Sequence, residues 1–282
     1  MRILFINNSS AGACGVREYG ALMIAALRRA GVEVIEWDGS YSAIQARGGQ
    51  YLPPDRSTYD LVHFNWHPGA INHYIPEHFA GGPPLSLYLG DVPPHSSCPV
   101  FNIATWRFAI DPCAGAQYLP TPIPPTPLDL PPPTLTPVTI GVSGVRGAGF
   151  ALTRAICEEK GWVINQHSDM WLSTEDEIRR LASCTVNVCW YQTTGRGKSM
   201  AAMFCIAAQR PLVISSSTMF SALWPYKDEI YSPRNGLDTL DLLLSVAVEH
   251  TQSGGAPIPH RARRELAWDV VIKTVVKQWE TP

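Results

Sequence analysis

The chain has 282 residues, 45% of them hydrophobic, which exceeds a single domain of common size and fills one or two ordinary cores. Its 22 Lys and Arg against 24 Asp and Glu give a net charge of -2, which excludes a global positive field for nucleic acid or anionic lipid. The seven cysteines include no CxxC pair, so neither a disulfide framework nor a zinc site is expected. No apolar run approaches the roughly 20 residues of a membrane span, and we expect a cytoplasmic protein.

The first half of the chain predicts a parallel sheet covered by helices. An apolar opening strand is followed by a glycine-containing loop and then by apolar residues at helical spacing from Tyr19 to Leu27. The strands of this half are predicted at 2–7, 32–37, 61–64 and 85–89. Because strands alternate with helices, ligands are expected at the carboxyl ends of the strands.

Prolines between 119 and 137 are too dense for a helix or a central strand, which predicts an extended connector. A second alternating series follows the connector. Its strands are predicted at 138–142, 162–165, 185–190 and 211–215, and its helices at 150–160, 174–182 and 199–208. The predicted organisation is a first Rossmann-like domain at 1–119, a connector at 120–137, a second Rossmann-like domain at 138–262 and a helix at 263–282 that crosses back to the first.

The strongest chemical motif lies between the strand at 185–190 and the helix at 199–208. After Tyr191 the chain reaches Gly195, and Arg196, Gly197, Lys198 and Ser199 then introduce the helix. A helix start with two cations and a hydroxyl has what binding a diphosphate requires. A Walker A loop would need glycine where this chain has Gln192, so a P-loop NTPase is disfavoured. A purely structural turn remains the alternative.

Two further glycine-rich turns follow strands. Gly12 and Gly15 let the backbone approach a ligand, and Glu18 lies on the first turn of the next helix. Arg146 lies in the equivalent turn of the second half and would neutralise a second phosphate charge. The alternatives are a tight turn without a ligand for the glycines and a solvated surface side chain for Arg146.

Candidates for acid or base catalysis follow strands of the first half. Asp91 comes after the apolar strand at 85–89, where partial desolvation would raise the pKa of its carboxyl group. An Asp at this place equally caps a turn. His67 follows the strand at 61–64, and its alternative is a histidine that hydrogen-bonds within its own loop. The other histidines show no ligand spacing, so no metal site is predicted.

In order and kind, these motifs resemble the GT-B glycosyltransferases, particularly the retaining group with a glycine-rich first loop. The segment from Gly12 to Glu18 is similar to that group's start, 119–124 to its interdomain connector, and 172–214 to its donor-binding half. The resemblance implies an α/β fold of two Rossmann-like domains facing across a cleft. The acceptor side would be 1–119 and the nucleotide-sugar donor side 138–262. The compact length also resembles phage members of the fold.

The resemblance implies roles for particular residues. The donor-binding set would be Gly12, Gly15, Arg146, Trp171, Tyr191, Arg196, Gly197, Lys198 and Ser199, with Trp171 near the nucleotide base. The catalytic candidates are Asp91, His67 and Glu18, and Asp91 matches the acidic member of the group's His-Asp pair. One departure is clear, because the second glutamate of the group's EX7E motif falls at Phe204.

The resulting hypothesis is transfer of a sugar from a nucleoside diphosphate donor, most simply a UDP sugar, to an acceptor hydroxyl without a required cofactor or metal. The acceptor would be a saccharide, a lipid or a modified DNA base. Two alternatives stay open: a phage-type enzyme acting on hydroxymethylated DNA bases, and a catalytically inactive nucleotide-sugar binding module. For a flipped DNA base, the residues expected around the acceptor are Trp66, His67, Trp106 and Arg107. The sequence leaves open retention versus inversion and the oligomeric state.

Overall fold

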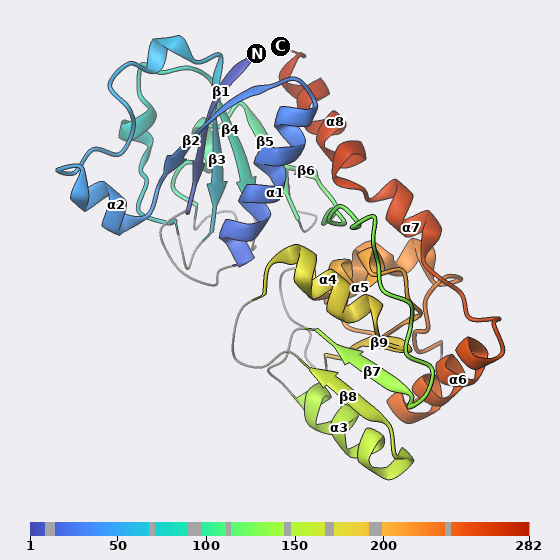
Figure 1. The fold of residues 1–282 in the computed structure, drawn as a ribbon. Helices are drawn as coiled ribbons and strands as arrows, with labels where there is room; N and C mark the ends of the chain where they lie inside the picture. The colour runs from blue at the N-terminus through green and yellow to red at the C-terminus, as the bar shows by residue number, and fades with distance from the viewer. Residues whose placement is uncertain are drawn as a thin grey trace. The chain divides into compact units, whose positions relative to one another are not determined.

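The structure is a computed structural model (Figure 1). The residues that it describes are 1–8, 15–67, 71–89, 98–110, 114–143, 148–166, 172–191, 199–234 and 238–281. The chain divides into two compact units. Unit 1 combines Met1–Pro120 with Trp268–Pro282, and unit 2 is Thr121–Ala267.

Unit 1 is built on a six-stranded parallel sheet with the order β2-β1-β3-β4-β5-β6. The strands are β1 (Arg2–Asn7), β2 (Glu33–Asp38), β3 (Leu61–Trp66), β4 (Leu85–Leu89), β5 (Trp106–Ala109) and β6 (Gln117–Tyr118). In the register, Leu4 pairs with Val62, and Val62 pairs with Leu85. Strands β1, β3 and β4 are buried almost throughout, as expected for central strands of a parallel sheet with both faces covered.

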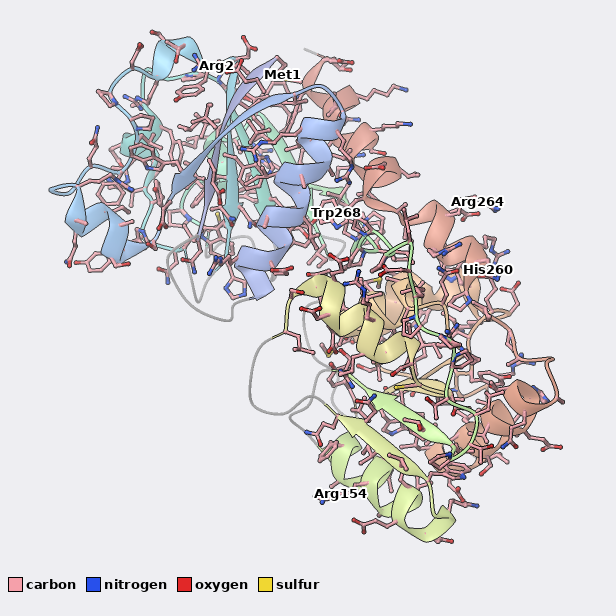
Figure 2. All side chains as sticks on the ribbon, in the orientation of Figure 1. Met1, Arg2, Arg154, His260, Arg264 and Trp268 are labelled. Atoms are coloured by element: carbon pink, nitrogen blue, oxygen red, sulfur yellow. The ribbon has the colours of Figure 1, made fainter. Side chains whose placement is uncertain are left out.

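The helices of unit 1 are α1 (Gly15–Arg29), α2 (Tyr41–Ala46) and α8 (Trp268–Trp279), with 3-10 turns η1 (Arg56–Thr58), η2 (Pro76–Phe79) and η4 (Phe101–Ile103). Helices α1 and α8 pack side by side (Figure 1). Trp268, labelled in Figure 2, is the first residue of α8. Its ring lies 5.0 Å from that of Tyr19, which stacks on Tyr88. Aromatic packing thus joins the last helix to the first helix and the sheet.

A buried polar cluster also ties α8 to the sheet of unit 1. The indole Nε1 of Trp279 donates to Ser86 Oγ at 2.8 Å, and Ser86 Oγ lies 3.0 Å from His63 Nδ1. The ring of His63 meets that of Trp279 edge-on at 5.4 Å. Burial lowers the pKa of His63 to about 3, so this histidine is neutral in the folded protein near pH 7.

Unit 2 contains a four-stranded parallel sheet with the order β10-β9-β7-β8. Its strands are β7 (Thr139–Val142), β8 (Val163–Gln166), β9 (Val186–Cys189) and β10 (Leu212–Ile214). The helices are α3 (Ala148–Lys160), α4 (Thr174–Ala182), α5 (Met200–Ala207), α6 (Leu240–Gln252) and α7 (His260–Glu265), with the 3-10 segment η5 (Thr218–Tyr226). Helices α3 and α6 pack on one face of the sheet, and α4, α5, α7 and η5 pack on the other. The predicted α/β fold of two Rossmann-like halves is confirmed.

The Pro-rich segment, expected as a connector at 120–137, is hydrogen-bonded to unit 2. The backbone N–H of Ile123 donates to the carbonyl of Leu266 at 2.7 Å. The hydroxyl of Thr126 donates to the carbonyl of Ala207 at 3.0 Å. An extended chain without internal hydrogen bonds satisfies its polar groups on the neighbouring elements in this way.

The single helix expected at 263–282 is wrong, because the structure has α7 and then α8 in this region. The carbonyl of Leu266 accepts its hydrogen bond from Ile123 N–H, which takes that acceptor out of a continuing helical ladder. Among the described residues, no helix combines the length and apolar character that crossing a membrane requires.

Candidate functional site

The carboxyl edge of the sheet in unit 2 gathers polar residues, as expected for a parallel sheet with a ligand site. Ser143 directly follows β7, Ser215 follows β10, and Tyr191 lies two residues after the end of β9. Helix α5 begins just after Ser199. The segment 192–198, which holds the predicted phosphate turn, therefore joins Tyr191 to Ser199 in the chain.

Tyr191 is held in place by its backbone and by its ring. Ser215 Oγ accepts from the backbone N–H of Tyr191 at 3.1 Å and donates to its carbonyl at 2.8 Å. The Tyr191 ring lies 5.5 Å from that of Phe220, and its hydroxyl accepts from Ser199 Oγ at 3.4 Å. Burial raises the pKa of Tyr191 to about 12, so the phenol is neutral near pH 7. Both ends of the segment 192–198 are thus fixed against each other.

Ser199 caps α5 with the hydroxyl that was expected to reach a phosphate. Its Oγ accepts from the backbone N–H of Ala202 at 3.3 Å, and its own N–H donates to the carbonyl of Met219. The residue is only 4% exposed. Its part in a phosphate site is therefore to start the helix, whose first N–H groups and dipole favour an anion.

The start of α3 lies against the chain that follows β9. Gly149 is the second residue of α3, and a Cβ at this position would overlap the carbonyl oxygen of Trp190. Only glycine permits this approach of two backbones. Segment 144–147 ends two residues before Gly149, and segment 192–198 begins two residues after Trp190. Both segments predicted to contact phosphates are therefore close in the chain to this backbone contact.

The described candidates of unit 1 lie at the carboxyl edge of its own sheet. His67 directly follows β3 and is half-buried, and its carbonyl accepts from Ile71 N–H at 2.9 Å. Glu18 lies in the first turn of α1, which begins at Gly15. The candidates Gly15, Glu18 and His67 thus follow β1 or β3 in the chain, as the sequence predicted for ligand-facing positions.

Two of the residues expected around a DNA base have other contacts. Trp66 is the last residue of β3 and is 2% exposed, so it lies inside the core instead of in a loop. The Arg107 guanidinium donates to the carbonyls of Phe101 at 2.7 Å and Asn102 at 3.2 Å. Trp106 is half-buried at the start of β5. The burial of Trp66 contradicts its interpretation as an acceptor contact, whereas the interpretation of Trp106 and Arg107 stays a prediction.

Several candidates lie outside the described residues and stay predictions. They are Gly12, Asp91, Arg146, Trp171, Arg196, Gly197 and Lys198. Within the described part of the chain, no group of three or more His, Cys, Asp or Glu side chains is arranged to hold a metal ion.

One pair of charged residues at this edge was missed from the sequence. Glu177 and Arg180 on α4 form an ion pair at 2.8 Å, with side chains 10% and 13% exposed. Their spacing of three residues on a helix is a recognisable signal for an ion pair. Nothing in that spacing indicates burial against the ends of β7 and β8.

Comparisons with known proteins identify the fold. No family model matches the chain, and no curated protein matches it. Solved structures do match over nearly the whole length. The glycosyltransferase AviGT4 of avilamycin A biosynthesis is 13% identical, with a TM-score of 0.62 over 99% of this chain and 97% of that one. HepE from Anabaena in complex with UDP is 12% identical, with a TM-score of 0.61 over 100% of both chains.

A third similar structure is an alpha-glucosyltransferase in complex with UDP and a 13-mer DNA. It is 12% identical, with a TM-score of 0.66 over 100% of both chains. At such identities the likeness concerns the fold, and the three proteins share it with both units of this chain. The chain therefore has the fold of the GT-B glycosyltransferases, as the sequence motifs implied.

Proposed function

We propose that the chain is a glycosyltransferase that moves a sugar from a nucleoside diphosphate donor, a UDP sugar, to an acceptor hydroxyl. The observation that carries the proposal is the junction of β9 and α5, where Tyr191 and Ser199 hold the two ends of the segment 192–198 at a helix start. Arg196 and Lys198 in that segment, together with the helix dipole, suit a diphosphate. Two of the similar structures were solved with UDP.

The same groups suit the chemistry of the transfer. Negative charge develops on the diphosphate as it leaves, and cations fixed beside it lower the barrier. The proposal needs no metal ion, because Arg196, Lys198 and the start of α5 supply this positive potential. If the reaction inverts, the acceptor hydroxyl needs a proton acceptor, which we assign to Asp91, with His67 and Glu18 as the other candidates.

Isothermal titration with UDP, GDP and ADP tests the donor assignment. UDP is expected to bind, and Arg196→Ala and Lys198→Ala should each weaken it about tenfold or more, because a hydrogen bond to a charged group contributes about 1.5–3 kcal/mol. Lys160→Ala is the matched control, since this lysine of unit 2 pairs with Asp241 at a surface site. If none of the three nucleotides binds, the donor assignment is wrong.

Turnover has to be tested separately from binding. Phe204, which stands where the resemblance places a glutamate, is half-buried and packs against the apolar core around α4 and α5. This substitution motivates the alternative of an inactive binding module. Release of glucose from UDP-glucose over hours, followed by chromatography, is expected for the enzyme. Binding with neither hydrolysis nor transfer to any acceptor offered would establish the binding module.

A DNA base is the second candidate acceptor, because an alpha-glucosyltransferase of the same fold was solved with UDP and DNA. The net charge of -2 gives this candidate no support from long-range attraction. Transfer of labelled glucose to a duplex with a hydroxymethylated base, compared with the plain duplex and with saccharides, separates the acceptors. Incorporation into the modified duplex that falls steeply with salt would favour DNA.

A further inference from the structure

The ion pair of Glu177 and Arg180 is buried on the side of α4 that faces the sheet of unit 2. Arg180 Nε donates to Glu177 Oε2 at 2.9 Å, and Nη2 donates to Oε1 at 2.8 Å. This is the two-pronged geometry in which a guanidinium and a carboxylate fix each other's orientation.

The rest of the pair's hydrogen bonds go to the ends of two strands. Arg180 donates to the carbonyl of Val142 at 2.9 Å and to the carbonyl and side-chain oxygens of Asn165 at 2.5 and 3.1 Å. Glu177 Oε1 accepts from Ser143 Oγ at 2.8 Å. The five hydrogen bonds of Arg180 match its five N–H donors, so none is left for a ligand.

Stability does not explain why charges occupy this place. A buried ion pair gains little over apolar side chains of similar volume, because removing two charges from water offsets their attraction. What the pair adds is geometry. It fixes the last residue of β7, the first residue after it, and the third residue of β8 to one rigid fork on α4.

We propose that the Glu177–Arg180 pair positions the donor site. The segments 144–147 and 167–171 directly follow Ser143 and the end of β8, and they carry the donor candidates Arg146 and Trp171. The pair sets where both segments leave the sheet, so Arg180 acts through the strands and does not contact the donor. This inference rests on the proposed function, since it takes these segments as donor-binding.

The double variant Glu177→Met with Arg180→Met tests the proposal with UDP as the probe. Because both charges are removed together, the variant leaves no lone buried charge and should still fold, with a Tm lowered by the loss of the donor to the carbonyls of Val142 and Asn165. The UDP dissociation constant should rise at least about tenfold, which corresponds to about 1.4 kcal/mol. Arg180→Lys keeps the charge but loses the fork, and it should weaken UDP by a smaller factor. If the double variant does not fold, Arg180→Lys is measured in its place by the same methods.

Arg179→Met is the matched control on the same helix. Arg179 pairs with Asp129 at 2.9 Å and with Glu175, both on the solvent side of α4. Its loss should leave the UDP affinity unchanged.

Hydrogen exchange separates positioning from general support. In the double variant the amides at the ends of β7 and β8, from Val142 to Ser143 and from Asn165 to Gln166, should exchange at least about tenfold faster, while those of β9 and α5 keep their rates. Unchanged UDP affinity in the folded double variant, or faster exchange throughout unit 2, would overturn the proposal. If the wild type does not bind UDP, the proposed function fails, and the exchange pattern alone then decides whether the pair fixes the ends of β7 and β8.

Discussion

Lowering the pH from about 7 to about 5 is expected to remove about 2 kcal/mol of unfolding free energy through His63 alone. Burial beside Phe5, Ser86 and Trp279 lowers the pKa of His63 to about 3 in the folded protein, against about 6.5 in the unfolded chain. Protonation therefore favours the unfolded state. The contribution is fully present above about pH 6.5 and is lost as the pH falls toward 3, at about 1.36 kcal/mol per unit.

This loss of unfolding free energy is nearly the same for any pKa of His63 below about 4 in the folded protein. Urea unfolding followed by tryptophan fluorescence measures it in the wild type and in His63→Asn, which keeps a polar group near Ser86 and does not titrate. Between the two pH values the wild type should lose about 2 kcal/mol more than the variant. The pH dependence that comes from the other histidines and from unit 2 is the same in both proteins, so it cancels in this difference. Equal pH dependence in the two proteins would refute the reasoning.

Substitutions at two further positions, Gly149 and Ser199, probe the candidate site. Gly149→Ala places a methyl group on the carbonyl of Trp190 and should cost at least about 2 kcal/mol in urea unfolding, whereas Gly255→Ala, whose Cβ meets only Ser253 Oγ at 3.9 Å, should stay within about 0.5 kcal/mol. Equal effects would show that the contact of α3 with Trp190 is not tight. Ser199→Ala should cost about 1 kcal/mol as a lost helix cap, while Ser199→Asp keeps the cap but puts a negative charge beside the donor phosphates. Titration should therefore find UDP binding weaker in the Asp variant than in the Ala variant, and the reverse order would contradict a diphosphate at this helix start.

The strands of both sheets were largely predictable because they are short apolar runs with sharp ends. β1 and β4 have the predicted bounds, and β9 and β10 lie inside theirs. β3 runs beyond its predicted end at Phe64, because the amide of Asn65 donates to Asn7 Oδ1 within the sheet and so satisfies a polar residue inside the strand. Helix α6 and strand β5 were not predicted, nor were helix α2 and strand β6. The last two are the shortest of these elements. They span six and two residues, too few for a periodic pattern to show.

The candidate site was predictable only in outline. Loops at the carboxyl ends of parallel strands follow from the strand order, and the helix start at Ser199 follows from its side chain. The pair of Glu177 and Arg180 does not follow. In the sequence Arg179 and Arg180 are alike, yet the first forms ion pairs on the solvent side and the second is buried. The difference comes from the face that α4 turns to the sheet, which is a property of tertiary packing.

The hydrogen bond from Trp279 to Ser86 joins residues 193 positions apart, and this has a consequence for synthesis on the ribosome. Unit 2 is one unbroken stretch, Thr121–Ala267, whereas unit 1 needs Trp268–Pro282 as well as the start of the chain. Although the strands of unit 1 are translated first, Tyr19 and Ser86 receive their partners from α8 last. The nascent chain can therefore complete unit 2 before α8 packs beside α1 on the sheet of unit 1, and during that interval a chaperone or a misfolded contact would act.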